Sequence, residues 1–223
     1  MALRAALPAA GALLVSACAT PVGRYYPLDA GRSWTYTTLI QSANGQGATA
    51  DTRVANLPAR TLAGRTVTPQ ETDAFGQRRL RFISADELGV VEIADQDSAA
   101  AEPQIRDPAN AILKTPLEPG AAWETTWETS QFGGRTLLPM TKTVESTDRP
   151  CTVAAGTFDN CLHLKLNGSG PVRADNGSAI VDVAGEEWFA PGVGYVRGLF
   201  TESVRDRPEN GVHVEVSLNA RTP

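Results

Sequence analysis

The stretch Pro27-Leu28-Asp29-Ala30-Gly31-Arg32-Ser33-Trp34 recurs later in the chain as Pro116-Leu117-Glu118-Pro119-Gly120-Ala121-Ala122-Trp123. Both copies read P-L-x-x-G-x-x-W, and each leads into threonine-rich sequence. Proline fixes the backbone φ angle, and glycine permits the positive φ that closes a turn. Threonine and aromatic residues favour strands. Each copy therefore predicts a turn that opens a strand and places its tryptophan at the first core position.

The two copies divide the chain into pseudo-repeat halves, at about residues 25–110 and 114–218. A chain of 223 residues suits one domain, so we expect a single β-rich domain over residues 25–223. Residues 95–114 are polar and are interrupted by two prolines, which predicts a long loop between the halves.

Alternating apolar and polar residues predict strands along both halves. In the clearest case, Leu162, Leu164 and Leu166 alternate with polar residues. Frequent glycine and proline turns separate about ten to twelve such candidates, and no helix of about ten residues is expected beyond the N-terminal segment. This pattern predicts a mainly β protein with an antiparallel curved sheet, either a half-barrel or a sandwich, built from two similar halves.

Composition is that of an ordinary globular protein, with 42% hydrophobic and 20% charged residues. The formal net charge is −5. Because binding to phosphate backbones requires a basic surface, this charge argues against nucleic acid as a partner.

The N-terminal residues 1–17 contain one basic residue, Arg4, followed by an apolar run and small residues. This is the pattern of a secretory signal peptide, and the run is too short to span a bilayer as a helix. It ends in Val15-Ser16-Ala17-Cys18, which resembles the lipobox of bacterial lipoprotein precursors. That resemblance implies lipid attachment at Cys18 and a tether at residues 18–24. The alternatives are an ordinary signal peptide that is cut after residue 19, or a cytosolic protein with an apolar start.

A lipid at Cys18 would anchor the protein to a membrane, since each buried methylene of an acyl chain contributes about 0.8 kcal/mol. Residue 19 is alanine and not aspartate. In the sorting rule of enteric lipoproteins, which this N-terminus resembles, that residue implies the outer membrane. We therefore expect a lipid-anchored cell-envelope protein on the outer membrane, facing the periplasm.

The other two cysteines, Cys151 and Cys161, flank two β-runs around Ala155-Gly156. A hairpin there would bring the two side chains within bridging distance, and a periplasmic location permits the bond. We expect a disulfide between them; the alternative is a pair of buried thiols.

Catalytic and metal-binding signatures are weak. The sequence Gly192-x-Gly194 precedes a strand, whereas a phosphate site needs a helix N-terminus. The two histidines, His163 and His213, fall on the predicted polar faces of strands, and a zinc site would need them to converge with carboxylates. Asp95–Asp97 and the pair Glu186-Glu187 are interpreted as surface charge. We expect no enzymatic activity, no metal and no cofactor.

The four tryptophans are the more informative set. They are Trp34, Trp123, Trp127 and Trp188. Large aromatic residues dominate core packing, so these residues are expected as anchors of the sheet. The functional alternative is that they line a cavity for an acyl chain or another apolar ligand.

Several motifs together resemble a group of uncharacterised bacterial lipoproteins. Besides the lipobox and the first P-L-x-x-G-x-x-W, they are Ala155-Gly156-Thr157-Phe158 and Ala190-Pro191-Gly192-Val193-Gly194. The resemblance covers most of the mature chain and implies an envelope protein, but no activity. A weaker similarity of architecture links it to the half-barrel carriers of lipoproteins in the bacterial envelope.

Three functions follow as hypotheses. The first is a lipoprotein that binds an apolar ligand, such as a lipid, or an envelope protein partner. The second is a structural or assembly lipoprotein with a dry core. The third is an envelope hydrolase, which would require His163 or His213 beside a carboxylate in a pocket.

Overall fold

The computed structural model describes residues 22–97, 101–129, 131–133, 136–174 and 177–222. The predicted signal peptide, the lipid-attachment residue Cys18 and the first part of the tether lie outside these residues. Within the described chain, no helix is long and apolar enough to cross a membrane.

The described chain folds almost entirely into strands, apart from two short 3₁₀ turns, η1 (Val22–Arg24) and η2 (Gln131–Gly133). The strands of the N-terminal half are β1 (Ser33–Ser42), β2 (Gly47–Asn56), β3 (Arg60–Leu62), β4 (Arg65–Ala74), β5 (Gln77–Asp86), β6 (Gly89–Gln96) and β7 (Gln104–Lys114). Those of the C-terminal half are β8 (Ala122–Thr129), β9 (Thr136–Val153), β10 (Gly156–Ala174), β11 (Gly177–Ala190), β12 (Gly194–Val204) and β13 (Arg207–Thr222).

A single antiparallel sheet contains all these strands, in the order β7-β6-β5-β4-β2-β1-β13-β12-β11-β10-β9-β8, with β3 paired to β4 beside this path. The strands before residue 115 lie on one side of the β1–β13 pair, and those after it lie on the other. The predicted mainly β, curved antiparallel fold is confirmed. The sandwich alternative is not what forms, because one sheet curls on itself instead of two sheets packing together.

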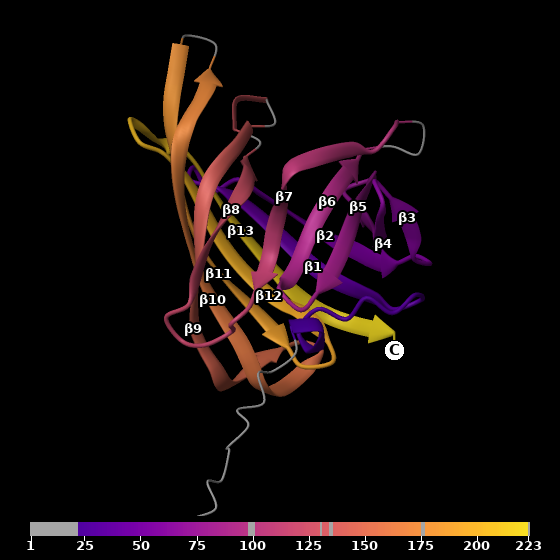
Figure 1. Ribbon diagram of the computed structural model, residues 1–223. Helices are drawn as coiled ribbons and strands as arrows, with labels where there is room; N and C mark the ends of the chain where they lie inside the picture. The colour runs from indigo at the N-terminus through magenta and orange to yellow at the C-terminus, as the bar shows by residue number, and fades with distance from the viewer. Residues whose placement is uncertain (1–21, 98–100, 130, 134–135, 175–176, 223) are drawn as a thin grey trace, which may run out of the picture.

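Curvature brings the two ends of the strand order, β7 and β8, next to each other (Figure 1). Side chains join them: Asn110 Oδ1 accepts a hydrogen bond from the Thr126 backbone N–H at 2.8 Å. The sheet is therefore nearly closed and barrel-like, with an enclosed inner face and a largely solvated outer face.

Both repeated motifs act as strand entries, as predicted. Gly31 and Gly120 have φ angles of 87° and 90°, so each occupies the left-handed region that favours glycine. The strands that follow bury Trp34 and Trp123, which are 5% and 6% exposed. Trp34 also donates from Nε1 to the carbonyl oxygen of Val193 at 2.7 Å, which ties the start of β1 to the turn before β12.

Inner-face packing follows the predicted alternation in the C-terminal half. Leu162, Leu164 and Leu166 of β10 are at most 1% exposed and join the largest core cluster. The disulfide between Cys151 and Cys161 is present at the predicted β9–β10 hairpin, where the two Cα atoms are 6.0 Å apart.

The loop predicted over residues 95–114 is wrong. Strand β6 extends to Gln96 and β7 begins at Gln104, so most of this stretch pairs in the sheet. Its prolines suggested a loop because proline cannot donate to a strand ladder. Strand β7 lies at one end of the strand order, however, and an edge strand tolerates Pro108.

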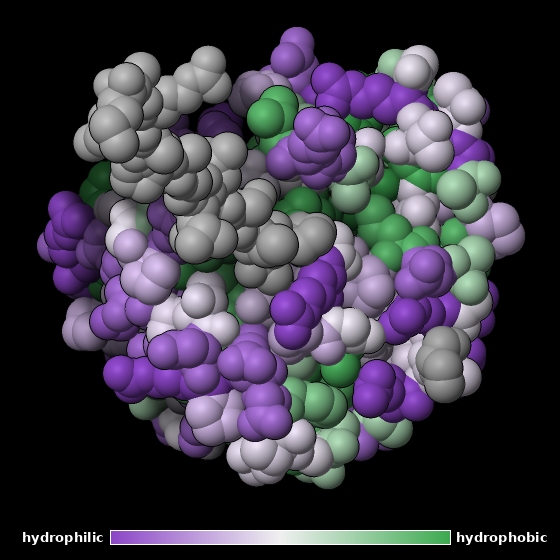
Figure 2. Space-filling view, turned by 60° about the horizontal axis from the view of Figure 1, so that its bottom comes forward, coloured by the Kyte–Doolittle hydropathy of each residue, from purple (hydrophilic) through white to green (hydrophobic). Residues whose placement is uncertain are grey.

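The N-terminal turn η1, drawn in indigo, covers the lower end of the sheet in Figure 1. The Tyr25 hydroxyl donates to the Asn160 carbonyl at 3.1 Å, and the Gly192 N–H donates to the Arg24 carbonyl at 2.7 Å. Figure 2 brings this end forward and shows apolar residues interspersed with hydrophilic ones. The segment next to the predicted lipid anchor is thus fastened to the end of the sheet.

Candidate functional site

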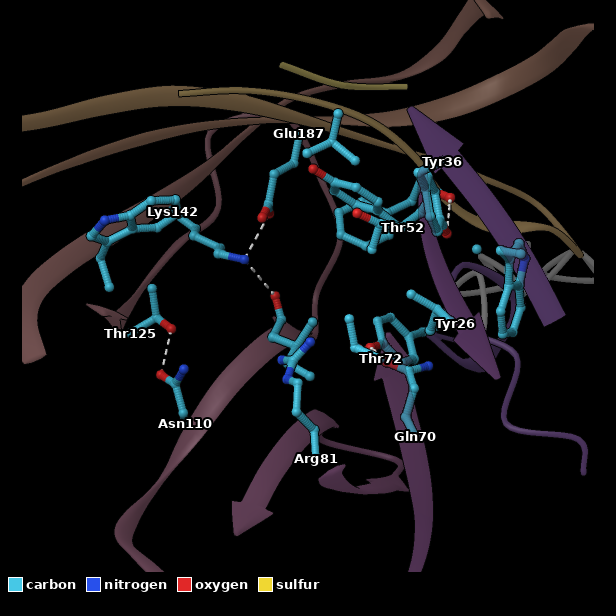
Figure 3. Close-up of a pocket in the computed structure, with 18 of the residues that line it drawn as sticks. Tyr26, Tyr36, Thr52, Gln70, Thr72, Arg81, Asn110, Thr125, Lys142 and Glu187 are labelled. Atoms are coloured by element: carbon cyan, nitrogen blue, oxygen red, sulfur yellow. Dashed lines mark hydrogen bonds and ion pairs between the residues drawn. The ribbon is translucent and has the colours of Figure 1, made fainter. Parts of the chain in front are cut away.

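A cavity of about 350 Å³ lies on the inner face of the sheet, and ten strands contribute to its wall. The wall combines aromatic, aliphatic, hydroxyl and charged side chains (Figure 3). It forms because the strands curl around the space and every second residue of each strand faces inward.

Aromatic residues from the β1, β11 and β12 side form one wall. The Tyr36 hydroxyl donates to the Tyr195 carbonyl at 3.0 Å, and the Tyr195 and Phe189 rings meet edge to face, with centroids 5.4 Å apart. From the segment after η1, the Tyr26 hydroxyl donates to Gln70 Oε1 at 2.9 Å. Burial raises the pKa of Tyr36 and of Tyr195 well above that of an ordinary tyrosine. This wall is therefore neutral over the physiological pH range.

An ion pair between β9 and β11 faces this aromatic wall. Lys142 Nζ lies 2.7 Å from Glu187 Oε2, and the two side chains are 8% and 12% exposed. Lys142 also donates to the backbone carbonyl of Ile112 on β7, at 3.4 Å. In Figure 3, Lys142 and Glu187 point toward each other across the cavity from Tyr26 and Tyr36. The cavity thus has a polar, hydrogen-bonding end and an aromatic end.

A second group of charges lies beside the cavity on strands β5 to β8. Glu92, which is 3% exposed, accepts from Arg81 Nε and from Arg106 Nε, both at 2.7 Å. Arg79 Nη2 bridges Asp95 Oδ2 at 2.6 Å and Glu128 Oε2 at 2.9 Å. We call this group the arginine–acid cluster; it consists of Arg79, Arg81, Arg106, Glu92, Asp95 and Glu128.

Arg81 belongs both to this cluster and to the cavity wall. Burial disfavours its charged form, but the neighbouring Glu92 carboxylate outweighs that effect and raises the pKa of Arg81. The guanidinium therefore stays charged at any pH at which the protein is folded.

The interpretation of Asp95–Asp97 and Glu186-Glu187 as surface charge is wrong for three of these residues. Asp95 and Gln96 are 6% and 7% exposed, and Glu187 forms the buried pair with Lys142. Period-2 alternation divides a strand into two faces but does not say which face becomes enclosed. Here the enclosed face accepts charge because Asp95 finds Arg79 on the neighbouring strand β5, and Glu187 finds Lys142 on β9, two strands away.

The structure separates the four tryptophans. Trp34 and Trp127 line the cavity, whereas Trp123 lies deeper in the core cluster. Trp188 is on the other face of β11, where its ring stacks on His163 with centroids 4.6 Å apart. The cavity-lining interpretation therefore does not hold for Trp123 and Trp188, because core side chains cover the first and strand alternation turns the second outward.

The two histidines do not converge. His163 on β10 bonds Glu186 Oε2 at 2.9 Å, and His213 on β13 lies 3.4 Å from Thr201 Oγ1. Strands β11 and β12 lie between the two histidines in the sheet. Neither histidine lines the cavity. Among the described residues, no group of three or more histidine, cysteine or acidic side chains could hold a metal ion.

The residues that sequence reasoning missed are the inward-facing charges. In β5, Arg79 and Arg81 alternate with Leu80 and Phe82. The face that carries the arginines is enclosed, and Arg81 lines the cavity. Phe82 lies on the opposite face, where it packs under β3 in a separate small core. Lys142 stands in a threonine-rich strand with no local signal of burial. Only the strand partners, which are distant in sequence, reveal these roles.

Comparisons with known proteins give likeness of fold alone. No family model matches the chain, and no curated protein matches it. A solved structure from Parabacteroides distasonis, described as a "putative lipoprotein", is 14% identical, with a TM-score of 0.43 over 89% of this chain and 98% of that one. Another, from Bacteroides fragilis, is described as a "putative exported protein" with a YmcC-like fold; it is 12% identical, with a TM-score of 0.46 over 89% and 99%.

Proposed function

We propose that this protein is a lipid-anchored envelope protein that holds a small amphipathic molecule inside its curved sheet. It acts as a binding protein and not as an enzyme. The observation that carries the proposal is the inner cavity, with an aromatic wall at one end and the Lys142–Glu187 pair at the other.

The volume and the lining both support a ligand. About 350 Å³ lies within the range of small-molecule sites, which combine apolar walls with a few convergent polar groups. Trp34, Trp127 and Phe189 offer apolar surface to the body of the ligand. Lys142 and Glu187 offer hydrogen bonds to its polar end. These polar groups narrow the apolar ligand expected from the sequence, such as a lipid, to one that also carries a polar group.

The cavity explains why charge is enclosed. A buried ion pair is weak support for stability, since removal from water offsets much of the attraction. Lys142 and Glu187 stand at the wall of a cavity and not in packed core, so an incoming polar group can replace the bond between them. Their position therefore suits recognition better than packing.

Ligand binding is tested with full-length protein purified from membranes. Native mass spectrometry looks for a bound molecule, and titration with 11-(dansylamino)undecanoic acid, a fluorescent fatty acid with a polar head, measures binding. The double variant Lys142→Met/Glu187→Leu should weaken binding at least about tenfold by removing the polar end. A matched pair on the outer face, Lys165 and Glu145, lies 3.0 Å apart and supplies the control Lys165→Met/Glu145→Leu. A folded protein that carries no molecule and binds no probe would disprove ligand binding and leave the assembly role.

The anchor is tested separately. Cells that express the protein should incorporate labelled palmitate into it, and the variant Cys18→Ser should not incorporate the label. Fractionation of the membranes then tests the outer-membrane location. Release of the wild-type protein in soluble, unlabelled form would contradict the anchor and favour an ordinary signal peptide.

A further inference from the structure

The junction between β7 and β8 is unlike the other strand junctions of the curved sheet. These strands stand at opposite ends of the strand order and share no backbone ladder among the described residues. We call this junction the seam. A ladder supplies most of the hydrogen bonds that hold neighbouring strands together, so at the seam side chains must supply them instead.

Side chains replace the missing ladder. Glu128 of β8 pairs with Arg79 of β5 at 2.9 Å and lies 3.7 Å from Arg106 of β7, and Asn110 makes the contacts to the β8 backbone. Asn110 Oδ1 accepts from the Thr126 N–H at 2.8 Å, and Asn110 Nδ2 donates to the Thr126 carbonyl at 3.4 Å. The amide of Asn110 thus pairs with Thr126 as the peptide group of a neighbouring strand would. Thr125 Oγ1 adds contacts to Asn110 Oδ1 at 2.7 Å and to the Ala111 carbonyl at 2.8 Å.

The cavity adjoins an outer groove at the seam. This groove of about 600 Å³ runs along the outer side of the seam, over β7, β8, β9 and β10. The groove and the inner cavity share five lining residues, which are Asn110, Ala111, Thr125, Thr126 and Met140. A single layer of residues therefore separates the cavity from the groove.

The backbone ladder between β7 and β6 is interrupted, although Arg106 of β7 still pairs with Glu92 and Asp95 of β6. The ladder pairs Glu92 with Asn110 and Ala94 with Ile105, so one residue of β6 faces the four residues 106–109 of β7. The bulge includes Pro108, which has no N–H to donate. Strand β7 can move at the seam without breaking a regular ladder with β6 in this stretch.

We propose that the seam is the entrance to the cavity and that Asn110 is its latch. Opening at Asn110 breaks the bonds of Asn110 and Thr125 and joins the outer groove to the cavity, while the ladders of the other strands and the ion pairs of Glu128 elsewhere on the seam persist. This inference rests on the proposed function, because it gives the ligand its route to the site.

The test measures access to the cavity without any ligand. Thr38 on β1 lines the cavity, and β1 stands far from the seam in the strand order. In full-length Cys18→Ser protein, the variant Thr38→Cys supplies a reactive thiol inside the cavity. Val196, which is 0% exposed and outside the cavity lining, supplies the control thiol as Val196→Cys. The rate of modification by N-ethylmaleimide is then measured with Asn110 intact, with Asn110→Ala and with Asn110→Asp.

Asn110→Ala should accelerate modification of Thr38→Cys about tenfold, because it removes the latch bonds to Thr126. Asn110→Asp retains an acceptor for the Thr126 N–H and should show a smaller acceleration. The rate at Val196→Cys should not change, since that thiol reacts only on wider unfolding. Equal acceleration at both thiols, or none at Thr38→Cys, would overturn the proposal and place the entrance at an end of the sheet.

Wild-type protein gives a second test that does not depend on the folding of variants. The Thr126 amide should exchange with solvent deuterium at least about tenfold faster than the laddered amides of β1. Exchange of Thr126 only through global unfolding would overturn the proposal. Failure of the fatty-acid probe to bind, together with a fast Thr126 amide and a positive thiol test, would disprove the ligand and not the entrance.

Discussion

The two halves of the sheet meet twice, and the two junctions are built differently. At the β1–β13 junction, backbone pairing runs from Ser33↔Thr222 to Ser42↔Val212 with one irregularity. At the seam, side chains make the connection: Asn110 of β7 bonds Thr126 of β8, and Glu128 of β8 pairs with Arg79 of β5 and Arg106 of β7. A backbone ladder depends little on residue identity, whereas the seam depends on a few particular side chains. Single substitutions should therefore weaken the seam far more readily than the β1–β13 junction.

The largest effect is expected at Glu92. The variant Glu92→Gln leaves Arg81 and Arg106 without their shared carboxylate, and breaking a buried ion pair costs about 3–5 kcal/mol. Urea unfolding monitored by circular dichroism measures this loss. As the control, Glu215→Gln breaks the exposed pair with Arg197 between β12 and β13 and should cost about 1 kcal/mol or less. Equal losses in the two variants would contradict the expectation that the enclosed charges beside the seam stabilise the sheet more than exposed ion pairs do.

The next largest loss of stability is expected on removal of the disulfide, which lies on the side of the β1–β13 junction. The β9–β10 hairpin packs there, since the Ala155 N–H donates to the Leu218 carbonyl of β13 at 3.1 Å. Replacing both Cys151 and Cys161 by serine opens a loop with a sequence separation of 10 residues. In the chain-entropy model, this costs about 2.5–3 kcal/mol of stability. Urea unfolding with and without reductant checks it, because reductant should destabilise the wild-type protein by a similar amount and leave the variant unchanged.

A smaller effect is expected at Trp127 on β8. Its Nε1 donates to Glu202 Oε1 at 2.6 Å, and Glu202 is 7% exposed. The variant Trp127→Phe keeps most of the ring but removes this donor from a buried carboxylate, which should cost about 1–3 kcal/mol. Thermal unfolding measures the loss. The variant Trp188→Phe on the outer face is the control. An equal loss of stability in that variant would show that the hydrogen bond from Trp127 to Glu202 is not the cause.

The tyrosines of the aromatic wall beside the β1–β13 junction should make the protein less stable at alkaline pH. They should not change its stability near neutral pH. Burial raises the pKa of Tyr26, Tyr36 and Tyr195 above the ordinary value of about 10. Between the unfolded and folded pKa values, the unfolded chain releases protons that the folded chain retains, so stability falls as pH rises above about 10. Tyrosinate absorbance during titration of folded and urea-unfolded protein measures this shift. Identical titration curves in the two states would show that the tyrosines are not buried.

Much of the fold could be predicted from local patterns. The turns at Gly31 and Gly120, the alternating leucines of β10 and the hairpin that joins Cys151 to Cys161 all follow from neighbouring residues. Strand β7 could not be predicted, because its prolines and polar residues are typical of loops. It can be a strand because it stands at the end of the strand order and pairs by backbone hydrogen bonds with β6 alone, not with a strand on each side.

The candidate site was predicted only in part. Trp34 and Trp127 line the cavity as one hypothesis allowed, but Lys142, Glu187 and Arg81 gave no sign of burial in the sequence. A charge is enclosed or exposed according to which partner the fold sets beside it. Lys142 and Glu187 are 45 residues apart in the chain, so their pairing depends on how β9 and β11 curve around the cavity.

The sequence by itself determined that the chain forms antiparallel strands, where its main turns fall and which cysteines bond, because these depend on contacts between near neighbours. Only the tertiary structure decided which face of each strand is enclosed, since alternation is symmetric between the two faces. Closure of the sheet also set β7 beside β8 and created the cavity, the buried charges and the seam. These features depend on curvature accumulated over the whole sheet, which no single stretch of sequence encodes.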